Sequence, residues 1–162
     1  ILMAILLPVI ESAKQQGRKT RARVEIRQFE AAWKSVLMDM RTWPSANMAY
    51  APYFGSVEAI DKMRWPLVNC LMGDNPKRIR YLEVRTNDMF NAGGGNLDDG
   101  GVKDPWGRIY RIKFDHDYDN QISITRGGGT MRTNEVISRS VAIWSEGPGR
   151  NLSDPSDDIL GW

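Results

Sequence analysis

Apolar side chains recur at helical spacing along the first quarter of the chain. From residue 9 to residue 41 they are separated mostly by three or four positions, which predicts one long helix with a single apolar face. The members of this stripe are Ala22, Ile26, Phe29, Trp33, Val36 or Leu37, and Met40. The opposite face carries the charged residues Arg23, Arg27, Glu30, Lys34 and Asp39. Thr42-Trp43-Pro44 is expected to end the helix, because the residue before a proline disfavours helical backbone.

A second, shorter helix is predicted from Val57 to Met72. Ser56 can cap its start, and Gly73 suits the left-handed residue that commonly follows a helix. Pro66 lies inside this segment and is expected to split it into two short pieces. Cys70 falls on the apolar side, so we expect a buried packing cysteine rather than a reactive one.

The pattern changes to strict alternation in the last third of the chain. It predicts strands at residues 108–115, 121–125 and 139–145, with residues 115–120 as a hairpin connection between the first two. One face of the first strand carries Tyr110, Ile112 and Phe114. A long helix followed by antiparallel strands indicates an α+β fold, in which the helix stripe packs on this apolar face of a small sheet.

The chain opens on an apolar segment, "ILMAILLPVI", that a domain of this size cannot cover. Ten residues are too few for a membrane span, which needs about 20. A helix of about 40 residues is ~60 Å long, whereas the radius of gyration of such a domain is ~15 Å. We therefore expect residues 1–21 to protrude, with a kink at Pro8, and residues 22–162 to form a globular head. The apolar end must be buried in a membrane, in other copies of the helix, or in both in turn.

Composition and charge narrow the range of functions. The 162 residues carry a net charge of +2, so the chain lacks the overall basic field typical of nucleic-acid binding. The basic run from Lys14 to Arg27 has no interleaved aromatic side chains, which favours a polar collar around the helix over a nucleic-acid site. Cys70 is the only cysteine and His116 the only histidine, so these residues offer neither an intrachain disulfide nor a His-rich metal site.

The predicted hairpin connection contains a candidate metal site. Asp115, Asp117 and Asp119 have the first, third and fifth positions of a calcium loop. That loop type needs glycine at the sixth position and glutamate at the twelfth, where this chain has Asn120 and Arg126. Asparagine tolerates a left-handed turn, but arginine cannot be a ligand. The alternative is a solvated turn in which the neighbouring histidine is exposed and inert.

Three segments of the chain resemble one known family. The segment "ILMAILLPVIESAK" (residues 1–14) resembles the second half of the N-terminal helix of type IV pilins and type II secretion pseudopilins. "DPWGRIYRI" (residues 104–112) resembles a turn and strand of the major pseudopilins, and "VAIWSEGPGRNLSDPSDDILGW" (residues 141–162) resembles their closing segment. The family helix begins with a processed, usually methylated phenylalanine and an early glutamate. The resemblance therefore implies about ten further apolar residues ahead of Ile1.

The resemblance implies a pilin fold with a loop-rich C-terminal segment, and a structural function. The chain would be a subunit of a helical type IV pilus-like filament or of a type II secretion pseudopilus. It would lie in the bacterial inner membrane before assembly and then in a periplasmic or extracellular filament. Its partners would be other copies of itself, the inner membrane, minor pilins and the assembly machinery, and not nucleic acid. The polymerisation residues would be Ile1, Leu2, Ile5, Leu6, Leu7, Pro8, Val9 and Ile10.

In the major pseudopilins the closing loop binds calcium, and the resemblance carries this cofactor to the present chain. Two consecutive aspartates of the family pattern are present, but Gly149 stands where the family commonly has aspartate. The alternative is a polar loop held by turns. The ligands implied are Asp154, Asp157 and Asp158, with the backbone of Leu152 and Ser153.

Two other functions remain open at this point. A minor or tip subunit would share the fold but bind a partner instead of forming the bulk of a filament. An enzyme anchored by one helix is the third alternative. We expect no enzyme, because the sequence has no recognisable nucleophile or base constellation and only one histidine and one cysteine.

Overall fold

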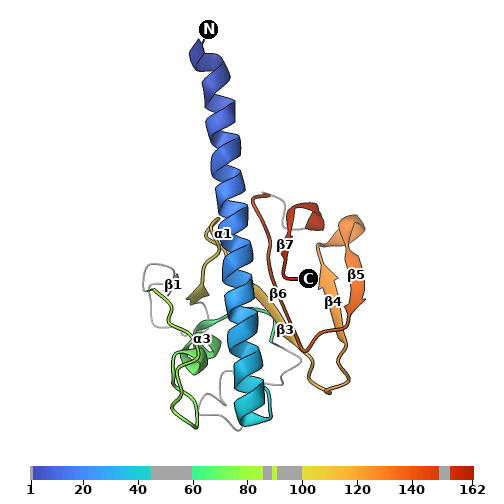
Figure 1. The fold of residues 1–162 in the computed structure, drawn as a ribbon. Coiled ribbons are helices and arrows are strands. Elements are labelled where there is room, and N and C mark those ends of the chain that lie inside the picture. Colours follow the sequence, from blue (N-terminus) through green and yellow to red (C-terminus); the bar gives the residue numbers. More distant parts are fainter. Residues whose placement is uncertain (1, 45–59, 86–88, 91–99, 150–153) are drawn as a thin grey trace.

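The computed structural model describes residues 2–44, 60–85, 89–90, 100–149 and 154–162. It confirms the α+β class: one long N-terminal helix lies against small antiparallel sheets (Figure 1). Helix α1 (Leu2–Met40) runs without interruption through Pro8. It ends where Arg41 takes a left-handed φ of 58° while its N–H still donates to the Leu37 carbonyl.

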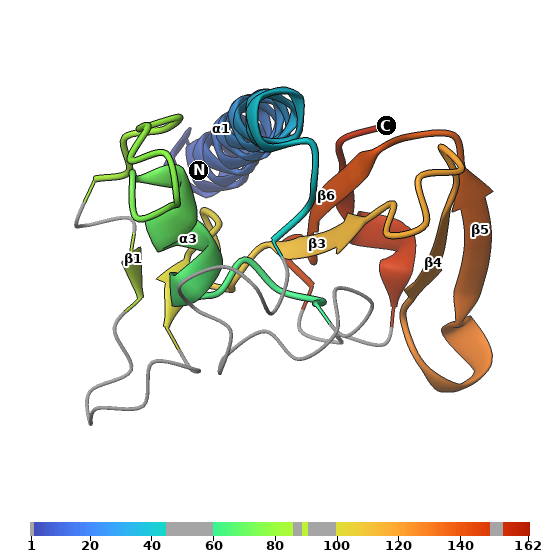
Figure 2. The same cartoon turned by 90° about the horizontal axis from the view of Figure 1, so that it is seen from below.

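The strands of the described residues form three small antiparallel sheets. The first pairs β1 (Met89–Phe90) with β2 (Gly101–Val102). The central sheet has the order β3-β6-β7, from β3 (Arg111–Phe114), β6 (Val141–Ser145) and β7 (Ile159–Leu160). The third is the hairpin of β4 (Ile122–Arg126) and β5 (Thr133–Ile137). Figure 2 shows α1 along one face of the central sheet, with α3 (Trp65–Leu71) on one side and the hairpin on the other.

The core lies between α1 and the central sheet, as the stripe predicts. The Phe29 ring meets Tyr110 edge-on with centroids 5.4 Å apart, and the Trp33 ring meets Phe114 in the same way at 5.0 Å. Leu37 and Met40 are half-buried at the margin. The buried members of the stripe are Ala22, Ile26, Phe29, Trp33 and Val36.

Glu30 departs from the pattern, because the sequence places it on the charged face of α1 and the structure buries it. Only 6% of Glu30 is exposed. The chain returns to α1 after β7, where Gly161 lies so close that a Cβ there would sit 2.8 Å from Ile26 Cγ2 and collide with Glu30 Oε1. Arg139 Nη1 donates to Glu30 Oε2 at 3.3 Å. Burial raises the pKa of Glu30, and the charge of Arg139 opposes that rise.

The predicted pairing of the strands is wrong in one respect. Residues 115–120 do connect β3 to β4, but these two strands do not pair with each other. Ile112 of β3 faces Ile143 of β6, and β4 pairs with β5, a strand that the alternation did not reveal. All five residues of β5 are exposed or half-buried, so this strand carries almost no apolar signal.

The second predicted helix is shorter than expected. It begins at Trp65, and the residue before it is extended, while residues 57–59 lie outside the described residues. Pro66 does not split the helix, because it falls in the first turn, where its missing N–H has no helical partner to lose. Gly73 has a φ of 111°, as expected after a helix. Cys70 is buried, as predicted, and burial raises its pKa to about 11.

β2 approaches the segment before α3 so closely that only glycine fits at position 101. A Cβ on Gly101 would collide with the Met63 carbonyl oxygen and lie 3.0 Å from Ile109 Cγ2. We expect Gly101→Ala to lower the free energy of unfolding by about 1–3 kcal/mol in urea denaturation. Gly17→Ala is the matched control, because a Cβ there meets no atom within 4 Å; it should be neutral or stabilising by up to about 1 kcal/mol. Equal stability of the two variants would contradict this reading.

Candidate functional site

The N-terminal half of α1 is the first candidate site, because it extends well beyond the head (Figure 1). From Pro8 to Arg21 no side chain is buried, and Ala22 is the first buried one. The division between residues 1–21 and 22–162 stays a prediction, and it lies next to this change in burial. Val9 and Ile10 are 62% and 58% exposed although both are apolar. We call Leu2–Arg21 the projecting segment.

The side chains of several predicted polymerisation residues are not described. Ile1 and the side chains of residues 2–7 lie outside the described part of the structure, although the helix itself includes residues 2–7. None of the described helices has an apolar stretch long enough to span a membrane. The head touches the projecting segment at Gln15, whose Oε1 accepts a hydrogen bond from Trp106 Nε1 at 3.1 Å.

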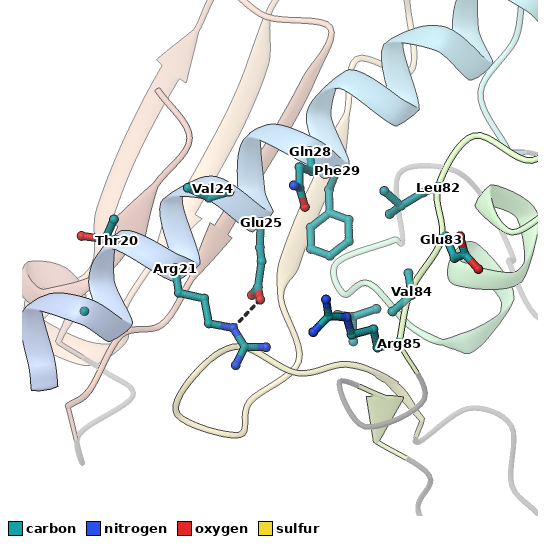
Figure 3. A pocket seen from close by; sticks show the side chains of 12 residues that line it. Thr20, Arg21, Val24, Glu25, Gln28, Phe29, Leu82, Glu83, Val84 and Arg85 are labelled. Atoms are coloured by element: carbon teal, nitrogen blue, oxygen red, sulfur yellow. Dashed lines mark hydrogen bonds and ion pairs between the residues drawn. The ribbon is translucent and has the colours of Figure 1, made fainter.

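A groove of ≈ 920 Å³ follows the side of α1 where the projecting segment meets the head (Figure 3). Its walls are α1 from Gly17 to Phe29 and the extended segment 82–85. Within it, Arg21 Nε donates to Glu25 Oε1 at 2.6 Å, and the Tyr110 hydroxyl donates to Glu25 Oε2 at 2.6 Å. Both carboxylate oxygens are thus engaged, and the bond from Tyr110 joins α1 to the chain that enters β3.

Asp104 organises the turn before β3. It is 4% exposed, and its Oδ1 accepts hydrogen bonds from the backbone N–H groups of Trp106 and Arg108, both at 2.9 Å. Its Oδ2 accepts a hydrogen bond from the Ser145 hydroxyl at 2.6 Å, and Ser145 Oγ in turn accepts from the N–H of Gly147 at 3.1 Å. The Asp104 carboxylate therefore ties this turn to the end of β6.

Arg108 completes the connection between the two segments. Its guanidinium donates to the carbonyl oxygens of Glu146 at 3.0 Å, Gly147 at 2.9 Å and Gly149. The segments 104–112 and 141–162, which carry the family resemblance separately, thus hold each other in place. We call these hydrogen bonds of Asp104 and Arg108 the clamp. Nothing in the spacing of the sequence linked the two segments, which are far apart in the chain.

Each of the three aspartates of the closing loop has at least one partner within the protein, although Asp157 Oδ1 is buried without one. Asp154 Oδ1 accepts from the Ser156 N–H at 2.9 Å and so caps the short 3₁₀ turn Pro155–Asp157. Asp157 accepts a hydrogen bond from the N–H of Gly149. In the described residues these side chains do not gather into a metal-binding group. Leu152 and Ser153 lie outside the described residues, so the calcium site of this loop stays a prediction.

Arg126 fills the place beside Asp158. The Arg126 side chain is only 9% exposed and forms ion pairs with Glu135 at 2.8 Å and Asp158 at 3.0 Å. Burial raises the pKa of Asp158 to about 6, and Arg126 opposes the rise. The sequence alone indicated only that Arg126 cannot be a ligand at the twelfth position of a calcium loop that begins at Asp115. Its structural role is to attach the β4–β5 hairpin to the closing loop.

The acidic loop, Asp115–Asn120, brings its three aspartates together. One carboxylate oxygen each of Asp115, Asp117 and Asp119 lies within 4.8 Å of the others, so the triad could hold a metal ion. Asn120 has a φ of 63°, the left-handed conformation expected at the sixth position. Burial raises the pKa of Asp115, and the charges of Asp117 and Asp119 act in the same direction.

The acidic loop is attached to the end of α1. Trp43 Nε1 donates to the Asp115 carbonyl oxygen at 2.6 Å, and the Trp43 backbone N–H donates to the Tyr118 hydroxyl at 3.1 Å. Trp43 itself is buried against Phe114, with ring centroids 4.7 Å apart. A change in the conformation of the acidic loop therefore directly alters the contacts of Trp43, a core residue.

Comparisons with protein-family models, with curated proteins and with solved structures found no match to this chain.

Proposed function

We propose that the chain is a structural subunit of a helical type IV pilus-like filament, and that it polymerises through the N-terminal half of α1. The observation that carries this proposal is the projecting segment. It has no buried side chain from Pro8 onward, and it presents Val9 and Ile10 to solvent. Apolar side chains on a protruding helix are stabilised when another surface covers them.

A filament supplies that surface from other copies of the chain. α1 has 39 residues and is therefore about 58 Å long, so helices from successive subunits can overlap along a common axis. Such a contact is heterologous and does not close, which produces a helical polymer. In this arrangement the heads form the outer surface, and the clamp holds each head rigid. Assembly would draw the helices from the bacterial inner membrane into a periplasmic or extracellular filament.

The proposal is tested with Val9→Lys, assayed by electron microscopy and by sedimentation of polymer from cells that overproduce the full chain. A lysine at this position places a charge where neighbouring helices would pack, so we expect a loss of filaments of about tenfold or more. The matched control is Val136→Lys. Val136 is 63% exposed against 62% for Val9, and it lies in β5, at the far edge of the head from α1 (Figure 2). The control should polymerise normally.

Three outcomes would oppose the proposal. If Val9→Lys polymerises as well as the parent chain, the projecting segment is not the assembly surface. If both valine variants lose filaments equally, the loss reflects the added charge and not the position. If the parent chain never forms filaments alone, the major-subunit function is wrong and a minor or tip subunit becomes the better proposal.

A further inference from the structure

The carboxylate of Asp115 is buried without a full set of partners. Asp115 is only 4% exposed, yet its Oδ1 has no hydrogen-bond partner, while Oδ2 accepts from the Asn120 N–H at 2.9 Å. A buried carboxylate oxygen without a partner is costly, and natural proteins usually satisfy it with a hydrogen bond, a water molecule or an ion. The Asp117 carboxyl can share a hydrogen bond with that of Asp115 when one of the two is protonated, and a cation can take the place of that proton when both are ionised.

The surroundings of that atom favour a cation. Asp117 and Asp119 are exposed, and each brings a carboxylate oxygen to within 4.8 Å of the others in the group. Like charges this close repel one another, and a cation among them removes the repulsion. Lys113 and His116 border the same depression.

We propose that the acidic loop binds a calcium ion through the carboxylates of Asp115, Asp117 and Asp119. The three carboxylates supply only oxygen, which suits hard cations and not zinc or copper. Calcium takes six to eight oxygen ligands in flexible geometry. One carboxylate is buried and two are exposed, so water can complete the shell on the outer side. This inference goes beyond the proposed filament function and does not depend on it.

The position of the loop gives the ion a structural effect. The Asp115 carbonyl oxygen accepts from the Trp43 indole, and the Tyr118 hydroxyl accepts from the Trp43 backbone. An ion that fixes Asp115, Asp117 and Asp119 therefore also fixes the turn in which α1 ends. Because Trp43 is in direct contact with the loop, it can also sensitise the luminescence of a bound terbium ion, which substitutes for calcium.

The test uses the purified full chain after removal of divalent ions with EGTA. Calcium is titrated by calorimetry, and terbium by luminescence excited through tryptophan. We expect a Kd on the order of 10⁻⁴–10⁻³ M, the range of weak extracellular calcium sites. Asp117→Asn should weaken binding about tenfold or more, because it removes one of three charged ligands. Asp117 is exposed and lies outside the core, so this variant should keep the fold of the parent, which the far-ultraviolet circular dichroism checks.

Asp74→Asn is the matched control, since it makes the same change at an exposed aspartate outside both the acidic loop and the closing loop. It should leave the calcium affinity and the terbium signal unchanged. The proposal is overturned if the parent chain binds neither ion in the millimolar range, or if Asp117→Asn binds as tightly as the parent. It is equally overturned if Asp154→Asn abolishes binding and Asp117→Asn does not, since the ion then lies in the closing loop. Filament yield is a separate readout, so failure here leaves the test of Val9→Lys intact.

Discussion

Trp33→Ala is expected to lower the free energy of unfolding by about 3–5 kcal/mol, the range for truncating a buried tryptophan. Trp33 is 0% exposed and packs edge-on against Phe114. Its indole Nε1 also donates to Met63 Sδ at 3.4 Å, which links α1 to the segment before α3. The truncation removes the apolar contact and leaves a cavity between the helix and the sheet. Urea denaturation followed by near-ultraviolet circular dichroism measures the loss.

Met38→Ala provides the control on the same helix. Met38 is 71% exposed and faces away from the sheet, so its truncation should change the stability by less than about 0.5 kcal/mol. If Trp33→Ala and Met38→Ala had similar effects, the apolar stripe would not be the main contact between α1 and the head.

Asp104→Ala is expected to lower the free energy of unfolding by about 3 kcal/mol, because it leaves three donors of the clamp without their acceptor. These donors are two backbone N–H groups and the Ser145 hydroxyl. A buried donor that loses its partner costs about 1–3 kcal/mol, and hydrogen bonds to charged groups lie at the upper end. Thermal and urea unfolding of the variant both report this change.

Two further variants distinguish the stability lost with the clamp from the stability lost by removing any negative charge. Asp104→Asn keeps one acceptor oxygen for the two backbone N–H groups, so its stability should fall between those of the parent and the alanine variant. Asp74→Ala removes an exposed aspartate and should be neutral to within about 0.5 kcal/mol. A neutral result for Asp104→Ala would show that the clamp contributes nothing to the fold.

The helix and its stripe could be predicted because a helix that buries one face carries apolar residues at regular helical spacing. The prediction failed at Glu30, a polar residue inside the buried face. Its burial is caused by Arg139 and Gly161, which reach α1 only through the fold. The residues next to Glu30 in the sequence therefore do not indicate that Glu30 is buried.

Strand pairing could not be predicted for a related reason. Alternation identified β3, β4 and β6, but it does not say which strand faces which. The short link at residues 115–120 favoured a hairpin of β3 and β4, whereas β3 pairs with the distant β6. Residues of β3 and β6 lie in the same core cluster, and this contact joins segments that are distant in the chain.

The candidate metal site could likewise be predicted only in part. The spacing of Asp115, Asp117 and Asp119 was visible in the sequence, and the structure brings their carboxylates together. The burial of Asp115 and its contact with Trp43 were not visible, because they depend on where α1 ends. The clamp was missed entirely, since its hydrogen bonds join segments about 40 residues apart.

The contact between α1 and the last strand has a consequence for the order of events during synthesis. Glu30 and Arg139 are separated by 109 residues, and β7 follows later still. A ribosome adds about 5–20 residues per second, so the apolar stripe of α1 waits roughly 5–20 s before the rest of the core exists. Whatever holds α1 during that interval therefore decides whether the apolar stripe packs on its own sheet or on another molecule.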